Sequence, residues 1–243
     1  MCIYEVLMSV HSITHLIGYG LVFCSLLALL LVIPEASAAA HKFKPGWRAW
    51  VWPLAFLGLL LKNSTETTAT LQKMGSSSFL WQMGDLATSF SLTMLVLNSI
   101  YRIINDTKAY RYALVVWLIF FLFVFAIFGL GLVAGLFIYE TICAAGICTF
   151  YGLLYLQQRN RAADAPPVIA GVALLFLSAS LYFIPIGIDL ALFMVDQVAI
   201  AHVVQIVALF FLYQGASNSY TVKYAAQRRL ERNSPTLDPK VKV

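Results

Sequence analysis

The sequence predicts an all-α, multi-pass membrane protein, a bundle of seven transmembrane helices with the N-terminus outside and the C-terminus in the cytosol. Three observations predict it. Hydrophobic residues make up 61% of the 243 residues and charged residues only 11%, whereas soluble domains carry about 25% charged residues. Apolar runs recur at the length of a transmembrane helix. The basic residues gather in alternate connections between these runs, as expected of cytosolic loops.

The apolar runs define the expected helices. A helix that crosses the hydrocarbon core of a bilayer needs about 20 mostly apolar residues. Seven segments have this length: 11–33, 47–71, 79–103, 112–130, 136–156, 167–190 and 195–213. We therefore expect a seven-transmembrane domain over residues 1–216 and a basic cytosolic tail over residues 217–243.

The basic residues set the expected orientation. With the N-terminus outside, 14 of the 16 Lys and Arg residues fall on the cytosolic side, in three inner loops and the tail, and only Lys62 and Lys73 fall outside. The opposite orientation would reverse this ratio, so the positive-inside rule favours an outer N-terminus. An even number of helices would separate the basic tail from the basic loops, which also favours seven.

The end of the first apolar run resembles a signal-peptidase site, because residues 34–40 read Pro-Glu-Ala-Ser-Ala-Ala-Ala. A signal peptide, however, begins with a basic region. Residues 1–10 contain Glu5 and no Lys or Arg. We therefore expect this run to be an uncleaved first helix.

Polar side chains within the expected helices gather towards their outer ends. Ionisable groups inside a membrane are costly and usually face the interior of the bundle, so each is a candidate site residue. The inner halves of the helices carry almost none. These outer positions predict a polar pocket lined by Asn63, Gln82, Glu140, Asp196 and Gln205.

The histidines suggest a metal site at the same level. His11 and His15 are four residues apart and share one face of a helix. Two or three imidazoles and a carboxylate suit Zn²⁺ with an open position for water. The sequence therefore predicts zinc ligands at His11, His15, Asp85 and His202. Asp85 and Glu66 are the expected catalytic residues, with Glu66 as the general base.

Each of these residues also has a purely structural interpretation. The two histidines of the first helix could sit among lipid headgroups, and Asp85 could favour the dipole of the third helix. Glu66 could pair with Lys62, which lies four residues before it, and a buried His202 could serve only as a hydrogen-bonding group. Asp189 and Asp196 flank a short outer loop and are expected to be solvated.

Three polar positions resemble a known superfamily. The run Asn63-Ser64-Thr65-Glu66-Thr67, the start of the third helix at Gly84-Asp85-Leu86, and His202 are arranged as in the seven-helix membrane hydrolases that include alkaline ceramidases, adiponectin receptors and haemolysin III proteins. The resemblance implies a zinc site with Asp85 and His202 among its positions. The chain departs from that family by having Val198 four residues before His202 and no histidine near the end of the second helix.

Several functions are compatible with this pattern. The first hypothesis is a metal-dependent hydrolase of a lipid amide or ester, with zinc as the candidate cofactor. The alternative is a seven-helix receptor, sensor or small-ligand binding protein. Haem binding through His15 and His202, and transport, are further alternatives. The expected partners are the lipid bilayer and a lipid or small-molecule ligand, with no nucleic acid, in the cell membrane or an inner membrane.

Overall fold

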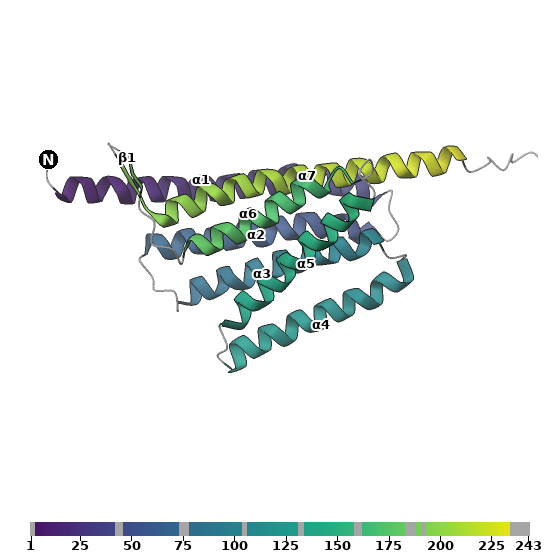
Figure 1. Cartoon of the computed structure of the whole chain (residues 1–243), viewed down its shortest axis with the longest axis horizontal. Helices are drawn as coiled ribbons and strands as arrows, with labels where there is room; N and C mark the ends of the chain where they lie inside the picture. Colours follow the sequence, from purple (N-terminus) through teal and green to yellow (C-terminus); the bar gives the residue numbers. More distant parts are fainter. Residues whose placement is uncertain are drawn as a thin grey trace, which may run out of the picture.

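The computed structural model describes the backbone of residues 3–41, 46–72, 78–103, 106–130, 134–157, 162–182, 188–190 and 193–233. Within these residues the fold is helical, which confirms the predicted all-α class (Figure 1). The helices are α1 (Ile3–Ala40), the 3-10 helix η1 (Gly46–Trp50), α2 (Val51–Leu71), α3 (Phe79–Ile103), α4 (Asp106–Leu130), α5 (Ala134–Gln157), α6 (Ala165–Leu181) and α7 (Gln197–Asn233). A short antiparallel hairpin, β1 (Ile188–Leu190) and β2 (Phe193–Val195), precedes α7.

The helices pack side by side, and successive helices run in opposite directions (Figure 1). The long helices α1 and α7 contact each other, α2 packs on α1 and α3, and α6 packs on α7 and α5. Helix α4 lies at the lower edge in Figure 1 and contacts α3 and α5. Helix α1 thus packs against both α2 and α7, whereas α4 forms an edge of the bundle.

Each predicted segment contains a helix, but several boundaries differ. Helix α1 extends over Ile3–Ala40, and α7 continues to Asn233, well beyond the predicted end at residue 213. Residues 223–232 are rich in good helix formers, so the loss of hydropathy after residue 213 did not mark the end of the helix. Helix α6 ends at Leu181, and residues 188–190 of the predicted segment form β1 instead. An apolar run alone does not distinguish helix from strand.

Three of the described helical segments are long and apolar enough to cross a membrane: Ile13–Ala40, Phe137–Gln157 and Gln197–Thr221. Two shorter apolar segments, Tyr110–Phe125 and Ala165–Leu181, lie in α4 and α6. Helices α2 and α3 are long but more polar, and several of their polar side chains point into the bundle.

The described surface exposes many large apolar side chains, while some charged side chains are buried among the hydrophobic core. Large apolar side chains such as Leu16, Phe121 and Leu156 are more than half exposed, whereas Lys62 and Asp164 are buried. A soluble monomer rarely exposes large contiguous apolar patches. Lipid solvates such a surface, so the fold supports membrane association.

A glycine lets α2 and α3 approach closely. A Cβ atom at Gly58 of α2 would lie 2.2 Å from Ser91 Oγ and 3.0 Å from the Ala87 carbonyl oxygen of α3. Small residues at such crossings allow close helix packing in membranes. This approach brings the polar side chains of α2 and α3 into one region.

Candidate functional site

Buried and half-buried polar side chains of α2, α3, α5 and α7 gather near Tyr182, the residue after α6. We call this group the polar cluster. Its members are Lys62 and Glu66 of α2, Asp85 and Ser89 of α3, Glu140 of α5, Tyr182, and His202 of α7.

An ion pair on α2 forms one side of the polar cluster. Lys62 Nζ donates to Glu66 Oε2 at 2.6 Å, and both side chains are buried. Their i, i+4 spacing places them on one face of the helix. The Tyr182 hydroxyl lies 3.5 Å from the same Glu66 oxygen and donates to it. The structural alternative of a Lys62–Glu66 pair is therefore realised, but inside the bundle rather than on the membrane rim.

The polar cluster contains more acidic groups than cations. Asp85 and Glu140 repel each other, and each also repels Glu66. Ser89 Oγ donates to Glu140 Oε1 at 3.0 Å. Lys62 is the one basic residue of the described chain that acts on both Asp85 and Glu140. Because unpaired charges are costly in apolar surroundings, the cluster favours an additional positive charge or protonation of a carboxylate.

His202 is the member of the polar cluster with an unsatisfied side chain. It is only 1% exposed, and neither imidazole nitrogen has a hydrogen-bond partner among the described residues. Its ring meets the Tyr182 ring edge-on at 6.5 Å and packs against Gly18 of α1. A buried polar group without a partner lowers stability. His202 therefore offers a donor and an acceptor that no described residue uses.

Other predicted pocket residues hold helices together. Asn63 Nδ2 donates to Ser25 Oγ of α1 at 2.7 Å. Asp196 Oδ1 accepts hydrogen bonds from Thr14 Oγ1 at 3.1 Å and from the Ala199 backbone N–H at 2.8 Å. Asp196 thus caps the start of α7 and ties it to α1, in contrast to the solvated position that its loop suggested.

The remaining predicted residues lie around the polar cluster. Gln205 is fully buried beside Tyr182, and Gln82 is half-buried near the start of α3. His15 is half-buried in α1, and the side chain of His11 lies outside the described residues. Within the described residues, no three His, Cys, Asp or Glu side chains are grouped so that they could hold a metal ion. Of the predicted zinc ligands, His15, Asp85 and His202 belong to no such group among the described residues, and the predicted site with His11 stays a prediction.

Sequence reasoning missed Tyr182 entirely. Its ring lies between Trp81, at 6.0 Å, and His202, and its hydroxyl reaches Glu66. A tyrosine near the end of a membrane helix is usually part of the interfacial aromatic belt. No sequence signal separates that role from a position inside the bundle.

A second group of buried charges lies at the opposite end of the bundle. Arg102, at the end of α3, forms a salt bridge with Asp164, which precedes α6 and is fully buried. The guanidinium of Arg48 stacks over the Tyr101 ring at 5.0 Å from its centroid. We call the first two residues the Arg102–Asp164 pair. The sequence prediction did not single out Asp164, because it lies in a connection between helices.

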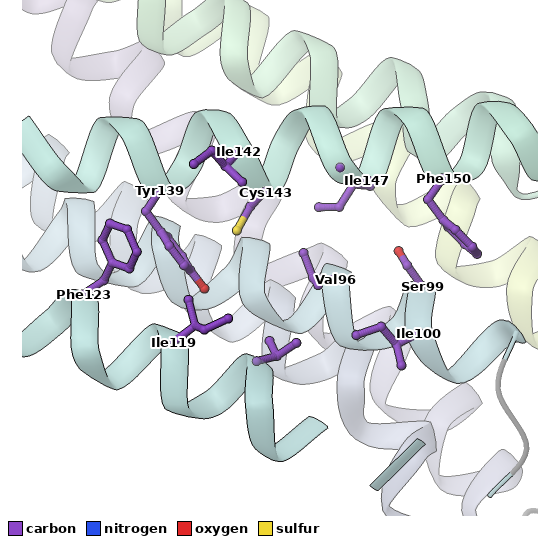
Figure 2. A pocket seen from close by; sticks show the side chains of 12 residues that line it. Val96, Ser99, Ile100, Ile119, Phe123, Tyr139, Ile142, Cys143, Ile147 and Phe150 are labelled. Atoms are coloured by element: carbon purple, nitrogen blue, oxygen red, sulfur yellow. The ribbon is translucent and has the colours of Figure 1, made fainter. Parts of the chain in front are cut away.

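A separate apolar cavity lies between α3, α4 and α5 (Figure 2). Its volume is about 450 Å³, within the range of about 300–1,000 Å³ for ligand pockets. Side chains such as Ile119, Ile142 and Ile147 line it. The cavity shares α3 and α5 with the polar cluster but has an apolar lining.

Comparison with known proteins adds a family but no activity. The model of a family of unknown function, DUF6962, matches residues 22–220, a range that contains the whole polar cluster. No curated protein and no solved structure matches the chain. Because the match covers most of the sequence, the chain belongs to the family of unknown function DUF6962.

Proposed function

We propose that the chain is a seven-span integral membrane protein of the cell or an inner membrane, with its N-terminus on the outer side. Helices α2 to α5 have 21 to 25 residues, which gives lengths of about 31–38 Å and exceeds the roughly 30 Å hydrocarbon core. Their alternating directions support successive crossings (Figure 1). The polar residues that lower the hydropathy of α2 and α3 include members of the polar cluster, where lipid does not reach them.

The position of Lys62 changes the count of outer basic residues on which this orientation rests. It counted as an outer lysine in the sequence, but it lies within α2, buried and paired with Glu66. It therefore does not belong to a loop and carries no weight in the positive-inside rule. Lys73 is then the only basic residue assigned to an outer connection, which strengthens the preference for an outer N-terminus.

Within this topology, the polar cluster serves as the binding site of a receptor or sensor for a small ligand. The observation that carries this function is His202, which is buried among charged groups and has no partner for either nitrogen among the described residues. Three carboxyl groups against one ammonium group favour a ligand with positive charge and hydrogen-bond donors. The Tyr182 hydroxyl reaches Glu66, and the Trp81 ring contacts the Tyr182 ring. These rings suit a cationic amine, since cations bind favourably to aromatic faces.

Trp81 provides a way to test this function. A panel of small organic amines is titrated into the purified full chain while tryptophan fluorescence is recorded. We expect at least one amine to change the signal saturably, with affinity about tenfold weaker in a Glu66→Gln variant, because a charge-assisted contact contributes about 1.5–3 kcal/mol. A Ser217→Ala variant, altered far along α7, is the control. Equal affinities in wild type and Glu66→Gln would contradict the proposed site.

Metal-dependent hydrolysis of a lipid amide or ester is the second candidate function. Glu66 and Asp85 act on each other electrostatically and both lie in the polar cluster with His202, which supports it. Its zinc site would require His11 and His15 as well. Elemental analysis of the purified chain decides this candidate. About one zinc per chain, lost in a His11→Ala/His15→Ala variant, supports hydrolysis, and protein without stoichiometric metal in the absence of chelators contradicts it.

A further inference from the structure

The cavity between α3, α4 and α5 has an apolar lining, in contrast to the polar cluster. Its lining comes from Val96 and Ile100 of α3, Ile119 of α4, and Ile142 and Ile147 of α5, among other side chains (Figure 2). Tyr139 lies at one end of it, and its hydroxyl is already hydrogen-bonded to Thr93 Oγ1 at 2.7 Å. The walls therefore offer almost no polar atom to a ligand, so the occupant must be apolar along its whole length.

The shape of the cavity narrows the choice of occupant. On α5 its lining extends from Tyr139 to Phe150, which corresponds to about 16 Å along the helix axis. This length matches about half of the roughly 30 Å hydrocarbon core, the depth of one leaflet. We call this elongated cavity of about 450 Å³ the slot. An extended hydrocarbon chain matches both its length along α5 and its apolar lining.

The cavity is accessible from the surrounding lipid. Ile119 and Ile142, on the two helices that flank it, are 43% and 63% exposed. Gly146 also lines the cavity, and a Cβ atom added there would meet nothing within 4 Å. Figure 2 shows side chains of α4 and α5 on either side of the slot. A chain can therefore enter sideways from the bilayer.

We propose that the slot between α3, α4 and α5 is a specific binding site for one hydrocarbon chain of a membrane lipid or fatty acid. The site holds the chain along α5 between Tyr139 and Phe150. The site stands independently of the ligand proposed for the polar cluster, because apolar contact with these walls is sufficient for binding.

Two glycines of α5 give a matched pair of variants. A Cβ atom added at Gly146 or at Gly152 would have open space around it, but only Gly146 lines the slot. A leucine at either position adds the same apolar volume and gains the same helix propensity. Gly146→Leu places that volume inside the slot, and Gly152→Leu places it elsewhere on the same helix.

The test uses a palmitate analogue that carries a photoreactive diazirine in mid-chain. The analogue is added to the full-length chain in lipid nanodiscs, and cross-linked residues are identified by mass spectrometry. We expect labels concentrated on slot residues such as Ile119 and Ile142. Gly146→Leu should reduce this labelling about tenfold, which corresponds to about 1.4 kcal/mol, because the leucine side chain occupies space that the hydrocarbon chain needs, while Gly152→Leu leaves it unchanged.

Labelling of the exposed face of α1, at Leu16 and Leu30, measures ordinary contact with bulk lipid. Label spread evenly over α1, α4 and α5 and unaffected by Gly146→Leu would overturn the proposal. Thermal unfolding of both variants in the same nanodiscs shows whether they remain folded. If Gly146→Leu unfolds, Gly146→Ala, which adds one methyl group to the slot, replaces it and should still reduce slot labelling relative to Gly152→Ala.

Discussion

Buried charges are paired differently at the two ends of the bundle. In the Arg102–Asp164 pair, one positive group meets one negative group and the nearby Arg48 stacks on an aromatic ring. In the polar cluster, one ammonium group faces three carboxyl groups, and the buried imidazole of His202 has no partner in the described chain. In the first arrangement each charge has a counter-charge or an aromatic ring beside it. The second is incomplete, which is typical of sites that give up stability for function.

Removing one partner of the Arg102–Asp164 pair should cause the largest loss of stability, because this pair has a structural role. Asp164→Ala leaves the buried guanidinium without its counter-charge, which costs about 3–5 kcal/mol. Unfolding of the detergent-purified protein, followed by circular dichroism, measures the loss. The double variant Asp164→Ala/Arg102→Met should recover most of it, because no charge is then left unpaired. An unchanged midpoint in Asp164→Ala would show that the pair does not hold α3 to α6.

Removing the cation of the polar cluster should have the next largest effect. Lys62→Met leaves Glu66 without the ammonium that lies 2.6 Å away, and loss of such a buried partner costs about 3 kcal/mol. Thermal unfolding measures this loss. The double variant Lys62→Met/Glu66→Gln should restore stability, because the glutamine needs no counter-charge. Failure of the second substitution to rescue the first would mean that Lys62 acts mainly on Asp85 and Glu140.

A substitution that pushes α2 away from α3 should displace the residues of the polar cluster that these two helices carry. Gly58→Val places methyl groups where Ser91 Oγ and the Ala87 carbonyl now lie, and overpacking of this kind costs about 1–3 kcal/mol. Gly20→Val is the matched control, since a Cβ at Gly20 meets nothing within 4 Å. Equal unfolding midpoints for the two variants would show that the α2–α3 crossing tolerates a wider spacing.

The sequence predicted the helical class because long apolar runs and the placement of basic residues follow directly from the physics of the bilayer. It did not predict that α7 continues to Asn233 or that residues 188–190 form a strand, because hydropathy does not report where a helix ends. The helix ends on either side of the hairpin depend on local backbone geometry.

The candidate site was predictable only in part. Glu66, Asp85, Glu140 and His202 stood out as ionisable residues in apolar surroundings, and the structure brings them into one cluster. Tyr182 did not stand out, because its role depends on the path of the chain after α6. The balance of three carboxyl groups against one lysine was also hidden, since Lys62 reads as a rim residue until its burial is known.

The most direct test of the contrast between the two ends is the stability of His202→Leu, measured by thermal unfolding beside Asp164→Ala. Leucine fills a similar volume, and the imidazole has no hydrogen bond to lose among the described residues. We predict that His202→Leu leaves the unfolding free energy unchanged or raises it by about 1 kcal/mol, because removing a buried unsatisfied group relieves its desolvation penalty. Amine binding should be lost in the same variant. A destabilisation as large as that of Asp164→Ala would contradict the account, because it would make His202 a structural residue like those of the Arg102–Asp164 pair.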